Sequence, residues 1–164
     1  DPKWGGPESV VFDQLTDWSQ NTDPGIKYYS GTVVYRQTFD LPKQDGQTLW
    51  LDLGNVKNMA RVRLNGKDLG VVWTAPWRVD ITAAVKSKDN QLEIEVVNLW
   101  ANRLIGDEQL PDDGIRDRQF PQWLTEGTAR TSGRYTFATR KHYNKNSPLL
   151  ESGLLGPVSI IIAL

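Results

Sequence analysis

The sequence contains no cysteine and a single histidine, and these absences exclude several kinds of site. Without cysteine the chain has no disulfide, no thiolate metal ligand and no cysteine nucleophile. His142 would have to serve alone in a zinc site or in a Ser-His-Asp triad, and no nucleophile elbow lies near it. We therefore interpret His142 as a surface or interface residue and assign no metal site and no catalytic residue.

Long hydrophobic runs and an excess of one charge are also missing. No apolar run approaches the roughly 20 residues that a membrane helix requires, so no membrane span is expected. The chain has 19 basic and 20 acidic residues, which gives no electrostatic reason to expect nucleic acid as a partner. Its 164 residues fit a single domain spanning 1–164, large enough to fold around one core without a metal or a disulfide.

Tryptophan is abundant instead. Seven Trp, with five Tyr and four Phe, supply more flat amphipathic surface than the core of a domain of this size usually needs. We interpret Trp4 and Trp18 as local packing anchors and Tyr135 and Phe137 as core residues. The remaining tryptophans are candidates for a binding surface.

The most regular stretch is a predicted hairpin around Asn65-Gly66. This dipeptide tolerates the positive φ that both central positions of a type I′ turn require. Pairing outward from the turn places Arg63 opposite Asp68 and Val62 opposite Leu69, so charge pairing and apolar burial favour the same register.

Alternating apolar residues predict further strands on both sides of the hairpin, over 31–39, 49–53, 79–81, 92–96, 134–138 and 158–164. Residues 82–90 are expected to be a short helix or a loop, and residues 106–132 form the least regular segment. The last strand is almost wholly apolar, so both of its faces are expected to be covered, by the second sheet and an insertion or by another domain. At least seven short strands predict an all-β fold, an antiparallel β-sandwich of jelly-roll type.

The order of several short motifs resembles a known family. The runs Y-R-Q-T-F-D-L-P, L-D-L-G-N-V, R-L-N-G-K-D-L-G and P-W-R-V-D-I-T are similar to the sugar-binding jelly-roll domain of family 2 glycoside hydrolases, which has a galactose-binding-domain-like fold. W-G-G-P, I-K-Y-Y-S-G-T, N-R-L-I-G-D-E-Q-L-P and S-P-L-L-E-S-G-L-L-G-P-V resemble more narrowly the β-sandwich region of bacterial proteins similar to family 106 α-L-rhamnosidases.

The resemblance implies a non-catalytic accessory module that is a fragment of a larger multidomain chain, and its implied partner is the catalytic domain of the same parent protein. It also implies a periplasmic or secreted location, although residues 1–7 carry no signal peptide. Contact with a plant or other glycan remains open. The alternatives are a freestanding lectin-like carbohydrate-binding domain and a small hydrolase that uses its acidic loop.

That acidic loop contains Asp107, Glu108, Asp112 and Asp113. Glycoside hydrolysis needs two carboxyl groups roughly 5 to 10 Å apart, one of them often with a raised pKa. Because no apolar pocket around the cluster can be argued from the sequence, we favour a solvated loop. No cofactor is expected. A structural calcium ion, common in jelly-roll carbohydrate modules, stays a less favoured alternative because the D-x-D-x-D-G spacing is missing.

Two groups of residues are candidates for binding glycan or docking against another domain, since sugar recognition and protein interfaces both use Trp and Arg. The first lies where the hairpin meets a proline turn, and the second where the 92–96 strand ends; both are expected at one rim of the sandwich. They comprise Trp73, Trp77, Arg78, Asn98, Trp100, Asn102, Arg103 and Asp107. Docking is the favoured role, and Trp50, on the polar face of its strand, has the same two alternatives.

Overall fold

The computed structural model describes residues 5–42, 46–134, 136 and 142–163, and these residues belong to two compact units. The first, called here the sandwich unit, consists of Phe12–Asp17, Gly31–Leu99 and Glu151–Leu164. The second, called the loop unit, consists of Asp1–Val11, Trp18–Ser30 and Trp100–Leu150. That residues 1–164 form one domain of a larger protein stays a prediction.

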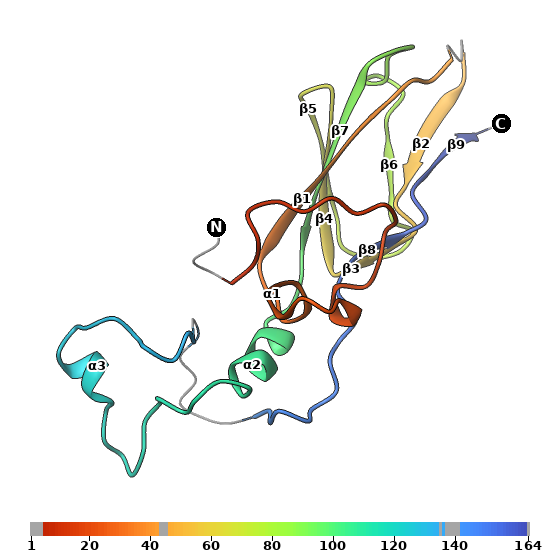
Figure 1. Cartoon of the computed structure of the whole chain (residues 1–164). Helices are drawn as coiled ribbons and strands as arrows, with labels where there is room; N and C mark the ends of the chain where they lie inside the picture. Colours follow the sequence, from red (N-terminus) through yellow and green to blue (C-terminus); the bar gives the residue numbers. More distant parts are fainter. Residues whose placement is uncertain (1–4, 43–45, 135, 137–141, 164) are drawn as a thin grey trace. The chain divides into compact units, whose positions relative to one another are not determined.

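The sandwich unit contains a four-stranded antiparallel sheet in the order β1-β7-β4-β5 (Figure 1). Its strands are β1 (Thr32–Phe39), β4 (Met59–Leu64), β5 (Lys67–Val72) and β7 (Asn90–Val97). β7 pairs along its whole length with β1 and over six residues with β4, so it is the central strand that fixes the register of both neighbours.

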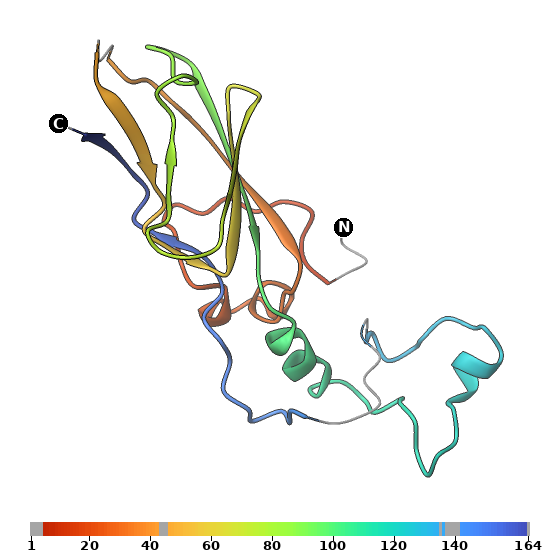
Figure 2. The ribbon, with the colours of Figure 1, turned by 180° about the vertical axis from the view of Figure 1, so that it is seen from behind.

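A three-stranded antiparallel sheet faces the first one within the sandwich unit (Figures 1 and 2). Its order is β6-β2-β9, with β2 (Thr48–Asp52), β6 (Arg78–Asp80) and β9 (Ser159–Ala163). A separate pair of short strands, β3 (Asn55–Lys57) and β8 (Gly153–Gly156), completes the nine strands of the described residues. The predicted all-β antiparallel sandwich is confirmed.

Alternating side chains of both sheets form the core. From the first sheet come Ala60, Val62 and Leu64 of β4 and Leu92, Ile94 and Val96 of β7; from the other strands and their flanks come Leu49, Leu51, Leu53, Val56, Val79, Ile81 and Leu154. Each large aliphatic side chain removed from water contributes about 1.5–3 kcal/mol. The expected inward positions at residues 49–53, 79–81 and 92–96 are confirmed.

The hairpin turn has the predicted geometry, with φ of 53° at Asn65 and 79° at Gly66. Arg63 pairs with Asp68 as expected, whereas Arg61 pairs with Val71, so the register shifts by one residue between Arg61 and Arg63. Because Val62 lies at this shift, its pairing with Leu69 stays a prediction. The physical reason for the shift is a bulge at Gly70, whose φ of 96° favours glycine.

A buried amide that the sequence did not reveal connects three segments of the sandwich unit. The Asn90 side chain, fully buried, donates from Nδ2 to the carbonyl oxygens of Phe39 and Lys86. Its Oδ1 accepts from the backbone N–H of Lys86 and from Nδ2 of Asn65. Asn65 therefore has two roles, because it forms the turn and also holds the start of β7.

Two expectations for the sandwich unit are decided or left open. Residues 82–89 form turns and loop, so the loop alternative is the one observed. The short strand β3, which begins at Asn55 and pairs with β8, was not predicted. Ile162 of β9 is 42% exposed, so the opposite sheet does not cover that side of the edge strand. Cover of β9 by another domain stays a prediction.

The loop unit has only short helices in its described residues: η2 (Trp18–Gln20), α1 (Pro24–Lys27), α2 (Ala101–Asp107) and α3 (Gln122–Thr125). Trp18 is buried and meets the Tyr29 ring edge to face, as expected of a packing anchor. His142 is exposed, as interpreted. Trp4, Tyr135, Phe137 and most of the expected 134–138 strand lie outside the described residues. None of the described helices has the length and apolar character needed to cross a bilayer.

We predict that Asn90→Ala lowers the free energy of unfolding by about 3 kcal/mol. The substitution leaves the buried backbone groups that now bind the Asn90 side chain without a hydrogen-bond partner. Chemical denaturation followed by circular dichroism measures the loss. The neighbouring exposed Gln91→Ala serves as the matched control and should change stability by less than about 0.5 kcal/mol. Equal effects of the two substitutions would show that the buried amide is not what holds the start of β7.

Candidate functional site

The outer side of the four-stranded sheet carries an apolar patch at one end. Met59 pairs with Val97, Val71 pairs with Arg61, and Trp73 follows β5 directly. Met59, Val71 and Trp73 are 37%, 47% and 75% exposed, whereas Val97 is half-buried. These four residues form what we call the apolar patch, and the strand alternation that buries Ala60 and Val62 places Met59 on this side.

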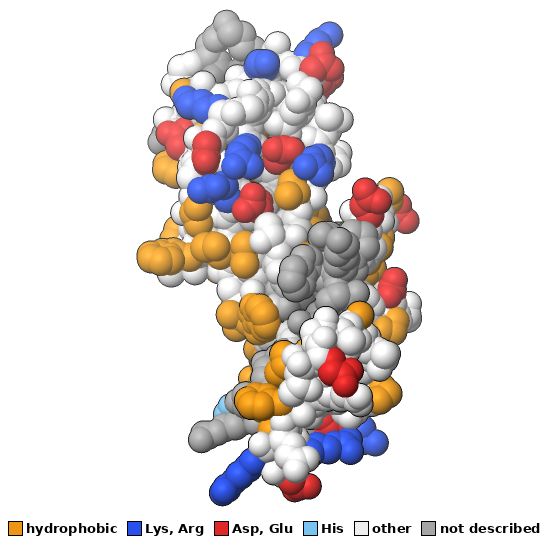
Figure 3. All heavy atoms as spheres, turned by 90° about the vertical axis from the view of Figure 1, so that its left-hand side faces the viewer, with side chains coloured by type: hydrophobic (Ala, Val, Ile, Leu, Met, Phe, Trp, Pro, Cys, Tyr) orange, Lys and Arg blue, Asp and Glu red, His pale blue; other side chains and the backbone are white. Residues whose placement is uncertain are grey.

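Ion pairs occupy the rest of the same sheet face. Arg36 contacts Glu93 at 2.9 Å, Arg61 contacts Asp68 at 3.7 Å and Arg63 contacts Glu95 at 3.8 Å. Figure 3 shows this mixture of basic and acidic side chains, with hydrophobic side chains gathered next to it. Exposed ion pairs of this kind contribute little stability, so we interpret the charged part of this sheet face as an ordinary solvated surface. The apolar patch differs from it, because exposed contiguous apolar side chains are uncommon on a solvated surface.

The outer side of the three-stranded sheet is different, because a tryptophan lies among charged side chains. Trp50 pairs with Asp80, and Asp52 pairs with Arg78. Arg78 Nε lies 2.7 Å from Asp52 Oδ2. The hydrogen bond from Arg78, helped by the Gly54 N–H, lowers the pKa of Asp52, and hydrogen bonds from Thr82 lower the pKa of Asp80. Both carboxyl groups are therefore ionised at neutral pH.

Two other predicted site residues of the sandwich unit have structural contacts. Trp77 is half-buried, and its carbonyl oxygen accepts from the Leu53 N–H at 2.8 Å, which extends the pairing of β2 and β6. Asn98 is buried, accepts from the Gly31 N–H at 2.9 Å and donates to Ser152 Oγ at 2.7 Å. Of the predicted set in this unit, Trp73 and Arg78 offer the most accessible side chains.

The other four predicted residues lie on or beside α2 in the loop unit. Trp100 is 64% exposed. Asn102 is buried and binds both backbone groups of Leu150, donating to its oxygen at 2.7 Å and accepting from its nitrogen at 2.8 Å. Arg103 contacts Asp107 at 3.3 Å along the helix. Whether the two predicted groups share one rim stays a prediction.

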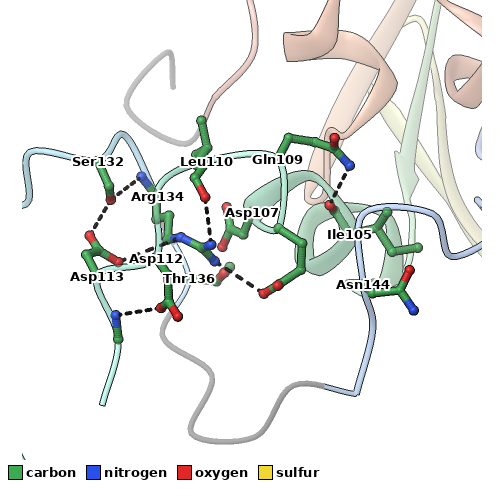
Figure 4. Close-up of polar contacts among 12 residues, drawn as sticks. Ile105, Asp107, Gln109, Leu110, Asp112, Asp113, Ser132, Arg134, Thr136 and Asn144 are labelled. Atoms are coloured by element: carbon green, nitrogen blue, oxygen red, sulfur yellow. Dashed lines mark hydrogen bonds and ion pairs between the residues drawn. The ribbon is translucent and has the colours of Figure 1, made fainter. Parts of the chain in front are cut away.

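The acidic loop is not the solvated segment that we expected, because Arg130 and Arg134 of the loop unit hold it. Figure 4 shows Arg134 among these residues. Asp113 accepts from Arg130 Nη2 at 2.7 Å and Nε at 3.0 Å, and also from Ser132. Arg134 contacts Glu108 at 3.4 Å and donates to the carbonyl oxygens of Leu110 and Pro111. The Arg130 guanidinium also lies 4.7 Å from the centre of the Trp123 ring. The sequence offered no spacing that would have revealed these long-range pairs.

The pKa values of two carboxyl groups of this loop shift in opposite directions. Asp107 is only 2% exposed, and burial raises its pKa despite the nearby Arg103 and Arg134. Burial acts on Asp113 in the same sense, but hydrogen bonds from Arg130 and Ser132 outweigh it and lower the pKa. A raised pKa suits a general acid, but the Asp107 side chain is enclosed by protein. Its acidic neighbours Glu108 and Asp113 form ion pairs with Arg134 and Arg130, so neither offers a second free carboxyl group beside it. Within the described ranges no cluster of three or more His, Cys, Asp or Glu side chains could hold a metal ion.

The fold and these surfaces define a β-sandwich domain of the galactose-binding-like class, and comparison with known proteins identifies its family. Residues 11–141 match the family described as "Glycosyl hydrolase 2 galactose-binding domain-like". Because this match covers most of the chain, the protein belongs to that family. The predicted resemblance to the jelly-roll domain of family 2 glycoside hydrolases is confirmed.

Individual relatives are much longer proteins. A "Putative beta-glucuronidase" of Formosa agariphila is 49% identical over 158 residues, a match that covers 92% of this chain and 14% of the relative. The solved rhamnosidase from Novosphingobium sp. PP1Y is 37% identical, with a TM-score of 0.76 over 99% of this chain and 14% of that chain. A β-glucuronidase from Ruminococcus gnavus, 22% identical with a TM-score of 0.50 over 59% of this chain and 18% of that chain, shares the fold alone.

We predict that Asp113→Asn destabilises the protein at pH 7 by about 2 kcal/mol, since it removes a charge-assisted pair with Arg130. The folded-state pKa of Asp113 lies below the ordinary value of 3.8, so its contribution is complete above that pH and is lost as pH falls through the folded pKa. Melting temperatures measured from pH 7 to pH 2 should therefore converge for the two proteins at the acid end.

The matched control is Asp112→Asn, because Asp112 is exposed and its contact with Arg116 is longer, at 3.7 Å. It should change the melting temperature little at any pH. A gap between wild type and Asp113→Asn that stays constant down to pH 2 would mean that the ionised carboxylate is not the stabilising form.

Proposed function

We propose that this chain is a non-catalytic accessory module of a bacterial glycoside hydrolase, similar to α-L-rhamnosidases, and that it docks against the catalytic domain of the same parent protein. The parent is proposed to be a periplasmic or secreted enzyme of polysaccharide degradation. Two observations support this role: family membership, and the fact that the chain spans only 14% of the length of each of the two relatives.

The single observation that carries the docking role is the apolar patch. Exposed contiguous apolar surface on a domain usually marks a contact with another protein, and interface centres are depleted of charged residues. Met59, Val71 and Trp73 meet that description, while the ion pairs beside them would form the polar rim. The catalytic domain is the favoured occupant because the relatives are long chains that contain this segment as a small part.

The acidic loop supports the non-catalytic part of the proposal. A glycosidase needs two carboxyl groups that both reach the scissile bond. Asp107 is enclosed, and Asp113 is held by Arg130 through two hydrogen bonds. The carboxylates of Asp113 and Glu108 therefore have a structural role, because their contacts with Arg130 and Arg134 hold the acidic loop in place. This role requires arginine partners and no substrate.

Docking can be tested by hydroxyl-radical footprinting of Trp73. We expect its oxidation rate to be several-fold lower in a longer parent chain that includes this segment than in the 164-residue chain. Trp18, buried in its own unit, is the internal control and should react slowly in both. Equal reactivity of Trp73 in the two proteins would remove the docking role and favour a freestanding domain.

The non-catalytic assignment has a direct test. The 164-residue chain should release no nitrophenol from p-nitrophenyl α-L-rhamnopyranoside or p-nitrophenyl β-D-glucuronide above the buffer rate. Turnover that disappears in Asp107→Asn or Asp112→Asn would instead establish the small-hydrolase alternative.

A further inference from the structure

The strand β9 is an edge of the three-stranded sheet, and among the described residues it pairs with β2 alone (Figures 1 and 2). The hydrogen bonds of β2 show which groups of β9 this leaves. Leu49 of β2 bonds toward β6, because its carbonyl oxygen accepts from the Ile81 N–H at 2.9 Å. Backbone groups of successive residues point to opposite edges of a strand. Trp50 therefore bonds toward β9, where its partner is Ile161.

It follows that Ile160 and Ile162, on either side of Ile161, direct their backbone N–H and C=O groups away from β2. Their side chains lie on the inward side of the sheet, since they pair with the buried Leu51 and Leu49. Ile162 is nevertheless 42% exposed, whereas Leu49 is 3% exposed. In the described part of the chain, the sheet is thus incomplete at β9 both in its hydrogen bonds and in the cover of its inner face.

The other edges of the two larger sheets carry features that discourage a further strand. β1 carries the ion-paired Arg36, and β5 has the bulge at Gly70. β6 has only three residues, of which Arg78 and Asp80 are charged. Charges, bulges and short length are the usual means by which proteins block pairing at an edge. β9, with the sequence S-I-I-I-A, contains no charge, proline or glycine, so it is an open pairing site that a working protein has to cover.

We propose that an extended segment of the parent chain, outside residues 1–164, pairs with the free edge of β9 as a further strand of this sheet. Its backbone bonds to the N–H and C=O groups of Ile160 and Ile162, and its inward side chains are apolar and cover Ile162. This inference rests on the proposed function, since it requires a parent chain. It goes beyond that function, because the edge of β9 belongs to the other sheet and is not the apolar patch.

The small size of this edge favours a segment of the same chain over a second copy. β9 has five residues, whereas a stable interface between separate proteins takes about 20–30 residues from each side. Two copies joined through β9 alone would therefore bind weakly. A tethered segment needs no such area, because a tether gives it an effective concentration of about millimolar. Both long relatives have ample chain to supply it, since this chain spans 14% of each.

The added strand can be tested by amide hydrogen exchange, resolved to single residues, in this chain alone and in a longer parent chain that includes it. We expect the Ile160 and Ile162 amides to exchange at least about tenfold more slowly in the parent chain, because the added strand accepts their hydrogen bonds. The Ile161 amide, bonded to β2, is the matched internal control and should exchange slowly in both proteins. Slow exchange of Ile94, in the central strand β7, shows that the sandwich unit is folded in each.

A variant removes one donor from the free edge. Ile162→Pro has no N–H at this position and spares the bonds between β9 and β2. In the parent chain it should return the Ile160 amide to the exchange rate of the chain alone. Ile162→Val, which keeps the N–H, is the matched control and should leave that rate unchanged. If Ile161 also exchanges faster in the proline variant, the comparison of the two wild-type proteins decides.

Equally fast exchange of Ile160 and Ile162 in the two wild-type proteins would overturn the proposal. Protection already present in the chain alone would overturn it as well, and a dependence on protein concentration would identify a second copy as the occupant. Either result would leave docking at the apolar patch standing, because footprinting of Trp73 tests it separately. Conversely, equal Trp73 reactivity together with protected Ile160 would remove that docking role and keep the added strand.

Discussion

The pairing of β7 with both β1 and β4 is the constraint on which the sandwich unit depends. Its inward residues Leu92, Ile94 and Val96 are buried, so a slip of one residue would turn all three toward water. Asn90 fixes the start of this strand through four hydrogen bonds. Once β7 is fixed, the outward positions of its sheet follow, and with them the separation of that surface into ion pairs and an apolar patch.

The two sheets of the sandwich unit present different chemistry to solvent. On one sheet Met59, Val71 and Trp73 adjoin ion pairs without being surrounded by them, which suits the proposed contact with another protein. On the other sheet Trp50 lies opposite Asp80, and Asp52 is paired with Arg78. The apolar patch is therefore confined to one sheet, because the outward positions of the other carry charged side chains.

The loop unit shows how hydrogen bonds and ion pairs can order a long irregular connection. Arg130 and Arg134 bind carboxylates and carbonyl oxygens of residues 108–113, and Asn102 binds both backbone groups of Leu150. Each planar guanidinium carries several N–H donors, so one arginine can hold more than one segment of the chain. The acidic residues that resemble a catalytic cluster in the sequence are used instead to hold the chain.

The sequence alone predicted the strands of the two larger sheets, the Asn65-Gly66 turn and the family, because these depend on the local period of apolar residues, on turn chemistry and on motif order. It did not predict the short strands β3 and β8. It also identified Trp73 and Arg78 as accessible candidates. Only the tertiary structure decided the bulge at Gly70, the burial of Asn98, Asn102 and Asp107, and the arginine ties of the acidic loop. Each of these depends on which distant segment lies opposite a residue, and a single sequence carries no such information.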